Sequence, residues 1–187
     1  FSFAFLKKYW EVIGGDIYMA VKDFERSSTI NKGCNSSFIT LVPKTIDPNT
    51  FDDFRPISLL GCLYKIIAKV LAERLKKAIP LVISDTQTAF IKDRCILDGP
   101  LIVNEVISWL RKNKAKAFLL KIDFEKAFDC LNWCFLDSVM AQMEFGGKWR
   151  SWIQGCLSSA RASVIINGSA TKEFNMERGI RQGDPLY

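Results

Sequence analysis

The feature that most constrains the fold is an apolar run that ends in a carboxylate. Residues 117–120, Ala-Phe-Leu-Leu, lead through Lys121 and Ile122 to Asp123, after which the chain turns towards helix. A mostly apolar run of this length is typical of a strand buried on both faces. Phe118–Ile122 is therefore predicted to be a strand that delivers Asp123 to the edge of a sheet, where a carboxylate can hold a divalent cation.

A second signal lies near the C-terminal end of the sequence. Residues 178–185, Arg-Gly-Ile-Arg-Gln-Gly-Asp-Pro, form a basic loop punctuated by glycine, and Pro185 suits the first turn of a helix that the loop is expected to open. An acid on a strand and such a loop together suggest nucleotidyl transfer. The spacing from Asp123 to Phe128 is a weak pattern by itself, so Phe128 also fits an ordinary core aromatic.

Periodicity along the chain predicts an α+β fold. The expected elements are helices over 3–26, 62–79, 98–112, 131–144 and 147–157 and strands over 39–42, 55–59 and 118–122. The first helix is expected to bend near Gly14 and Gly15, and Pro80 is expected to stop the second, because proline cannot donate to the helix ladder. The apolar face that the third helix is expected to bury consists of Leu101, Ile102, Val106 and Leu110.

A β-hairpin is the strongest short-range signal in the chain. Asn167-Gly168 separates two β-prone runs, 161–166 and 170–176. Asn-Gly accepts the positive φ angles of a type I′ turn. A hairpin with this pair at its tip is therefore predicted.

Charge and cysteine usage narrow the class of protein. The net charge of +6 and pI near 9.0 suit a polyanionic partner. No apolar run approaches the ~20 residues that span a bilayer, so no membrane partner is expected. The six cysteines form no Cys-x-x-Cys pair and histidine is absent, which argues against zinc and favours reduced thiols in an intracellular protein.

Several further segments point to a family. They read Phe-Ile-Thr-Leu-Val-Pro-Lys at 38–44, Phe-Arg-Pro-Ile-Ser-Leu-Leu at 54–60, Tyr-Lys-Ile-Ile-Ala-Lys-Val-Leu-Ala-Glu-Arg-Leu at 64–75 and Gln-Thr-Ala-Phe-Ile at 87–91. Together with 123–129 and 178–186, these segments resemble, in order and in spacing, the reverse transcriptase domain of LINE-type non-LTR retrotransposons. The resemblance is strongest to the plant branch and covers nearly the whole chain.

The resemblance implies a right-hand polymerase fold. Residues 1–115 would form the fingers, rich in helix and in basic residues. Residues 116–187 would form the first half of the palm, with the strand of the first catalytic aspartate, two helices and the hairpin. The chain would thus be a fragment of one reverse transcriptase domain that lacks the thumb and the end of the palm.

The resemblance also implies the chemistry of an RNA-directed DNA polymerase, which transfers nucleotides from dNTPs to a primer 3′ end. Asp123 would be the first catalytic aspartate and would bind Mg²⁺ or Mn²⁺, with the backbone carbonyl of Phe124 as a further ligand. Lys44 and Arg55 match the bases that grip the triphosphate, for which ammonium and guanidinium groups are suited. Phe128 matches the aromatic ring that packs under the incoming sugar.

The other site residues are assigned by the same resemblance. Gln182 and Gly183 match the loop that meets the nascent base pair and complete the dNTP-binding set. The residues expected near the template strand are Gln87, Phe90 and Arg94. Asp129 is expected to be structural, as a cap of the helix that starts near Leu131.

The family's aromatic-Ala-Asp-Asp box has no counterpart in the 187 residues. The only Asp-Asp pair, Asp52-Asp53, adjoins Phe54-Arg55-Pro56 in the expected fingers. One carboxylate cannot hold the two metal ions of a polymerase. The chain is therefore expected to stop short of the box, to bind Mg²⁺ or Mn²⁺ only with a complete palm, and to be inactive as a fragment, with an exposed apolar edge at 118–122.

Three readings follow from these expectations. The first is a reverse transcriptase domain whose partners are an RNA template, a DNA primer and dNTPs, in a nuclear or cytoplasmic ribonucleoprotein. The second is a non-catalytic nucleic-acid-binding remnant that uses the basic fingers. The third is a retrotransposon relic without a selected role.

Overall fold

The structure, a computed structural model, describes residues 2–187 and has the predicted mixture of helices and strands. The helices are α1 (Phe3–Lys8), α2 (Trp10–Ser27), α3 (Cys62–Val82), α4 (Asp98–Lys112), α5 (Trp133–Gln142) and α6 (Gly147–Ser158), with a 3₁₀ turn, η1 (Phe51–Asp53). The strands are β1 (Ser36–Pro43), β2 (Phe54–Leu60), β3 (Arg161–Ile166), β4 (Ser169–Ala170) and β5 (Phe174–Asn175). Among the described residues, no helix is both long enough and apolar enough to cross a membrane.

The chain forms two compact units. One comprises the chain through Leu71 together with Lys126–Tyr187, and the other is Ala72–Glu125. The hydrophobic core lies in the first unit and consists of Phe24, Ile30, Leu60, Tyr64, Ile67, Ala68, Leu71, Met140, Ile153, Cys156 and Leu157. No residue of the second unit is buried.

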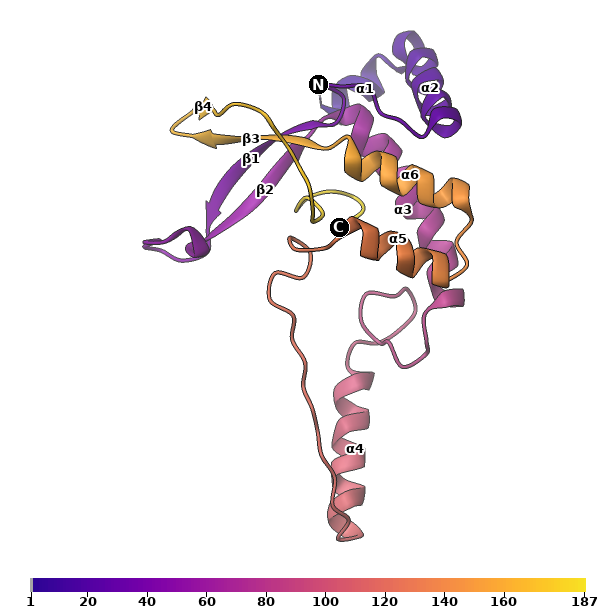
Figure 1. The fold of residues 1–187 in the computed structure, drawn as a ribbon, viewed down its shortest axis with the longest axis vertical. Helices are drawn as coiled ribbons and strands as arrows, with labels where there is room; N and C mark the ends of the chain where they lie inside the picture. Colours follow the sequence, from indigo (N-terminus) through magenta and orange to yellow (C-terminus); the bar gives the residue numbers. More distant parts are fainter. Residues whose placement is uncertain (1) are drawn as a thin grey trace. The chain divides into compact units, whose positions relative to one another are not determined.

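The sheet belongs to the first unit and has β1 as an inner strand (Figure 1). β1 pairs with β2 in antiparallel fashion, from Ser37 opposite Leu60 to Pro43 opposite Phe54. On its other side β1 pairs in parallel with β3, beginning with Ser36 opposite Arg161. The sheet therefore joins two strands near the start of the chain, β1 and β2, to a strand near its end, β3.

The predicted hairpin at 161–176 is confirmed. Asn167 and Gly168 both have positive φ, 50° and 80°, as a type I′ turn requires. Ile165 and Ile166 of β3 pair with β4, and the return side pairs again with β3 through β5. The return strand is thus divided into two short pieces.

Two predicted helix breaks are wrong. The first helical region is interrupted at Tyr9 and not near Gly14 and Gly15, which lie inside α2. The Trp10 ring lies 2.9 Å from the position of a Cβ on Gly14, so this glycine makes room for an indole and leaves the helix intact. Pro80 lies inside α3, where its missing N–H removes one bond of the last turns while Ile83 N still donates to Ile79 O at 3.0 Å.

Two further predictions fail in the second unit. Phe118–Ile122 is not a strand, because it has no partner strand among the described residues, and Phe118, 87% exposed, is not buried. α4 has the predicted bounds, but its Leu101 and Ile102 are more than half exposed, as is Val106. α4 is amphipathic, but no other part of residues 72–125 covers its apolar face.

Candidate functional site: a glycine-containing loop held against an edge strand

Residues 178–187 form a series of turns, and the predicted helix start at Pro185 is not observed. Gly179 N donates to Leu131 O at 2.8 Å, and Ile180 N donates to Phe128 O at 3.0 Å. Gly179 has φ of 77°, and a Cβ there would lie 2.4 Å from Asp129 O, so only glycine fits this crossing.

Phe128 lies at the surface of this crossing. Its ring is about half exposed, and its centroid lies 4.4 Å from that of Tyr187. The loop and the 128–131 segment therefore form one body, which brings the predicted sugar-binding aromatic to the Gln182 loop. This arrangement leaves one part of the Phe128 ring uncovered.

The other side of the loop rests on β2. Ser58 N donates to Gln182 O at 2.9 Å. Gly183 has φ of 97°, and a Cβ there would lie 3.3 Å from Ser58 O. Arg55 lies three residues before Ser58 on the same strand and is exposed. Gln182, Gly183 and Arg55 are therefore positioned by one edge strand.

Two lysines form hydrogen bonds with Asp52 at the tip of the β1–β2 hairpin. Lys44 Nζ donates to Asp52 O at 2.6 Å, and Lys126 Nζ donates to Asp52 Oδ1 at 2.9 Å. The hydrogen bond and charge of Lys126 lower the pKa of Asp52. Lys126 lies two residues before Phe128 in the sequence, and this spacing is the signal that could have singled it out.

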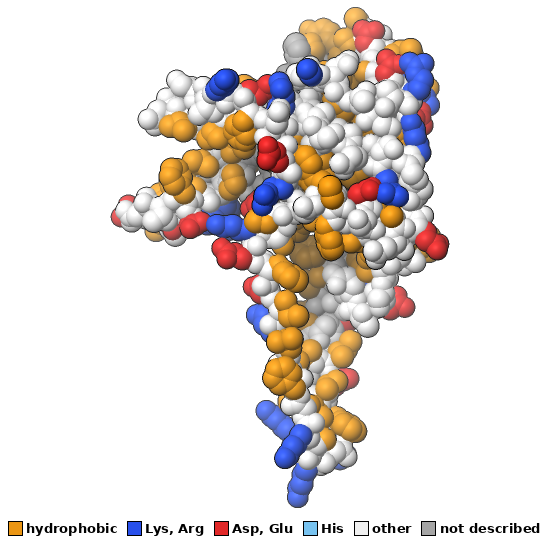
Figure 2. Space-filling view, viewed as in Figure 1, with side chains coloured by type: hydrophobic (Ala, Val, Ile, Leu, Met, Phe, Trp, Pro, Cys, Tyr) orange, Lys and Arg blue, Asp and Glu red, His pale blue; other side chains and the backbone are white. Residues whose placement is uncertain are grey.

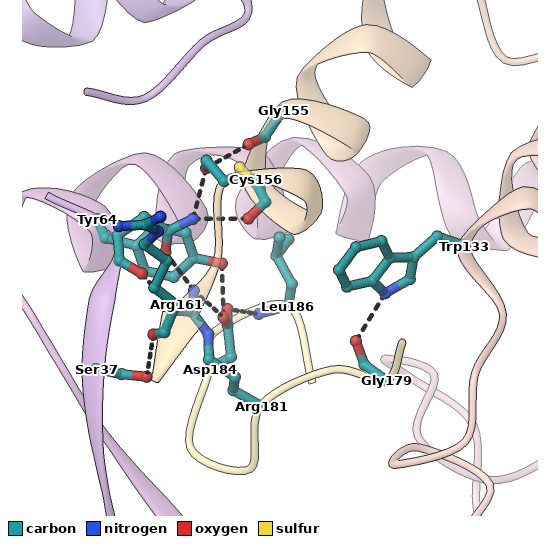
Figure 3. Close-up of polar contacts among 12 residues, drawn as sticks. Ser37, Tyr64, Trp133, Gly155, Cys156, Arg161, Gly179, Arg181, Asp184 and Leu186 are labelled. Carbon is teal, nitrogen blue, oxygen red and sulfur yellow. Dashed lines mark hydrogen bonds and ion pairs between the residues drawn. The ribbon is translucent and has the colours of Figure 1, made fainter. Parts of the chain in front are cut away.

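A buried polar network lies beneath the loop (Figure 3). Tyr64 OH donates to Asp184 Oδ2 at 2.6 Å, and Arg181 donates to Asn35 O at 2.9 Å. Burial, with the charge of Asp184, raises the pKa of Tyr64 well above its ordinary value. Sequence reasoning missed this network, because Asn35 and Tyr64 each lie more than a hundred residues from the loop and no local pattern connects them to it.

The expected metal ligands lie in the second unit. Asp123 and Phe124 are exposed, in a stretch without regular structure. Within residues 2–187, no group of three acidic, cysteine or histidine side chains is placed to hold a metal ion. The expected helix cap at Asp129 is wrong, because α5 starts one turn later with Asn132 as its N-cap, which accepts from Phe135 N at 3.0 Å.

The residues expected near the template strand also lie in the second unit, in the loop between α3 and α4. Arg94 donates to Ser84 O at 2.6 Å and to Gln87 O at 2.7 Å. It also forms an ion pair with Asp85 at 3.1 Å. Phe90 is fully exposed with φ of 62°. Arg94 thus holds the shape of its own loop, and Phe90 is the side chain that the loop presents.

Residues 42–186 match the family described as reverse transcriptase (RNA-dependent DNA polymerase). The chain belongs to this reverse transcriptase family, which confirms the membership predicted from its motifs. Reverse transcriptases generally use divalent metal ions and generally bind an RNA template and a primer.

Similar proteins come from transposable elements. The chain is 29% identical over 182 residues, 97% of its length, to the transposon TX1 uncharacterized 149 kDa protein of Xenopus laevis. It is 27% identical over 79% of its length to a Pol polyprotein of retrotransposable element R2 from Popillia japonica. A third similar protein is the R2DM Pol polyprotein of Drosophila melanogaster, 28% identical over 78% of the chain. The chain spans 14%, 20% and 14% of these relatives, and the match confirms the predicted LINE-type reverse transcriptase domain.

Proposed function

We propose that this chain supplies the nucleotide-binding part of a right-hand polymerase that copies RNA into DNA during retrotransposition. Residues 1–115 are assigned to the fingers and 116–187 to the first half of the palm. The observation that carries the proposal is the joining of Phe128, Gln182-Gly183 and β2 through backbone hydrogen bonds in one unit. The resemblance assigns these separate segments to one incoming nucleotide, and the structure holds them together.

The triphosphate is assigned to the basic side chains of the β1–β2 hairpin. Lys44 and Arg55 lie on this hairpin, and Lys126 reaches it through Asp52. A triphosphate carries more negative charge than the single Asp52 carboxylate, so it competes well for these lysines. Asp52 is therefore assigned as the counter-ion that the triphosphate would replace beside these lysines.

The metal ions are assigned to the exposed stretch that contains Asp123. A carboxylate from Asp123 and the carbonyl oxygen of Phe124 suit Mg²⁺ or Mn²⁺, which prefer oxygen ligands. A two-metal site needs more carboxylates than this pair supplies. Residues 1–187 alone are therefore expected to bind nucleic acid without extending a primer.

Nucleic-acid binding without chemistry is a second candidate function. A basic, exposed end of α4 favours it, and the Lys and Arg side chains at that end are seen at the lowest part of Figure 2. These residues are Arg111, Lys112, Lys114 and Lys116. Backbone phosphates bind such clusters with release of counter-ions, so binding would be strongly salt-dependent.

Primer extension and binding by the 187-residue chain test both functions. A DNA primer annealed to RNA is incubated with Mg²⁺ and dNTPs, and binding is followed by fluorescence anisotropy between 50 and 200 mM salt. We expect no extension, and binding that weakens by roughly 10³-fold over this range if about six phosphates are contacted. Asp123→Asn is expected to leave binding equal or slightly tighter, with Asp98→Asn on α4 as the matched control.

Two outcomes separate the candidates. Extension that is lost on Asp123→Asn would show that the chain already contains a working metal site. Addition of the remaining palm and thumb should create activity that Asp123→Asn abolishes. If the longer protein binds the same duplex but never extends it, the binding function alone remains.

A further inference from the structure

The two residues that flank Gln182-Gly183 both point into the protein interior. The side chains of Arg181 and Asp184 are each 3% exposed. Arg181 donates to Asn35 O at 2.9 Å and to Asn35 Oδ1 at 2.5 Å, and its guanidinium carbon lies 4.4 Å above the Tyr64 ring. A loop that looks basic in the sequence therefore carries one of its arginines inward.

Both oxygens of the Asp184 carboxylate are occupied. Oδ2 accepts from Tyr64 OH at 2.6 Å and from Arg181 at 3.3 Å, while Oδ1 accepts from Leu186 N at 3.0 Å. Burial raises the pKa of the neighbouring Cys156 thiol to about 12. Both oxygens of Asp184 thus have hydrogen-bond partners inside the protein.

The Gln182-Gly183 pair needs external anchors to keep one conformation. Gly183 has φ of 97°, and glycine populates many other backbone conformations equally well. Its hydrogen bond to β2 is a single contact, from Ser58 N to Gln182 O. Asp184 N also donates to Arg181 O at 2.9 Å across the pair, and the buried side chains of Arg181 and Asp184 add contacts that tie both flanks to the protein interior.

We propose that Arg181 and Asp184 are positioning residues, which fix Gln182-Gly183 against Ser58 by anchoring both flanks of this pair in the network with Asn35 and Tyr64. The proposal deepens the proposed function, since it rests on the assignment of this loop to the incoming nucleotide. Tyr64 holds Asp184 and supports Arg181 from its ring face, so one side chain of α3 secures both anchors.

Hydrogen exchange of the Ser58 amide tests the proposal directly in the 187-residue chain. Tyr64→Phe removes only the hydroxyl, and Asp184→Asn removes the charge. In each variant we expect Ser58 N–H to exchange roughly ten- to a hundred-fold faster, because the carbonyl that accepts from it is no longer held. The amides of α6 should keep their rates, and so should those of β2 that pair with β1.

Matched controls remove the same groups elsewhere. Tyr18→Phe removes an exposed hydroxyl from α2, and Asp137→Asn removes a carboxylate that pairs with Arg150. Neither should change exchange at Ser58. Unchanged exchange in both Tyr64→Phe and Asp184→Asn, with the chain folded, would overturn the proposal. If Asp184→Asn does not fold, the milder Tyr64→Phe decides.

A double variant separates positioning from general stability. Arg181→Met with Asp184→Leu replaces a buried ion pair with apolar side chains, a change that often preserves stability. We expect the melting temperature to stay near that of the unmodified chain while Ser58 remains unprotected. If the double variant keeps both its melting temperature and the slow hydrogen exchange of the Ser58 amide, the positioning role would be overturned. The hydrogen-exchange experiment contains no nucleotide and does not depend on nucleotide binding. A failure of nucleic-acid binding or primer extension would therefore count against the proposed function and not against the positioning role.

Discussion

Both compact units contain an amphipathic helical pattern, but its apolar side chains are buried in the first unit and exposed in the second. In the first unit, α3 buries Ile67 and Leu71, which are each 3% exposed. In the second unit, α4 and the stretch after it leave Ile102 and Phe118 more than half exposed, and hydrophobic side chains are visible in the lower part of Figure 2. An amphipathic pattern thus identifies the apolar face of a helix. Whether that face is buried depends on packing by segments that are distant in the sequence.

The largest expected effect contrasts two isoleucines on helices. Ile67→Ala should lower the free energy of unfolding by about 3 kcal/mol, because it leaves a cavity in the core. Ile102→Ala should change it by less than about 0.5 kcal/mol, since the side chain is exposed and alanine favours helix. Urea unfolding followed by circular dichroism measures both. Equal losses would show that α4 is buried in solution.

A pair of glycines sharpens the same contrast within the first unit. A Cβ on Gly155 of α6 would lie 1.9 Å from Ser28 O, whereas a Cβ on Gly15 of α2 meets nothing within 4 Å. Gly155→Ala should cost about 2 kcal/mol or more, because backbone must move. Gly15→Ala should stabilise the helix by roughly 0.5–1 kcal/mol. A tolerated Gly155→Ala would contradict the close packing of α6.

Limited proteolysis tests the second unit as a whole. Trypsin should cut first at the cluster of basic residues that follows Trp109, because the surrounding backbone opens easily. The expected sites are Arg111, Lys112, Lys114 and Lys116. Cleavage after Arg150, on α6 in the first unit, should be slower by at least about tenfold, since its helix must open. Mass spectrometry of the early fragments identifies the order of cleavage. Early cleavage after Arg150 would show that the first unit opens more easily than the second.

The smallest expected effect is a pH dependence at the α5–α6 ion pair. Arg150 donates to Asp137 at 2.8 and 2.5 Å, and this hydrogen bond, with the Arg150 charge, lowers the pKa of Asp137 below its ordinary value of 3.8. The pair therefore adds stability above about pH 3.8, and this stability is lost as pH falls through the lowered pKa. Asp137→Asn should flatten that part of the stability curve slightly, with Asp98→Asn as control. An unchanged acid limb would show that the pair contributes nothing.

Local signals in the sequence predicted local structure well. Asn167-Gly168 specified its own turn, and the apolar stripe of 62–79 placed α3 to within a few residues. The strand at 118–122 was not predictable from its own residues, because a strand needs a neighbour that its sequence does not contain. For the site, the predicted proximity of Phe128 to the Gln182 loop is observed. The roles of Asp123 and of the residues expected near the template stay predictions.

The network beneath the loop shows why some site features escape sequence reasoning. Arg181 and Asp184 have the composition of a solvated loop, and Tyr64 fits the apolar stripe of its helix. Their burial depends on hydrogen bonds between residues more than a hundred positions apart. Only the spatial arrangement distinguishes an anchor from a surface charge.

The parallel pairing of β1 with β3 can form only late in the synthesis of the chain. Ser37 Oγ donates to Arg161 O across 124 residues of chain. At translation rates of about 5–20 residues per second, the synthesis of β1 and β2 is complete roughly 5–21 s before that of β3. During this interval the hairpin has an open edge and no parallel neighbour, so a chaperone or a nascent partner has time to reach it before the sheet closes.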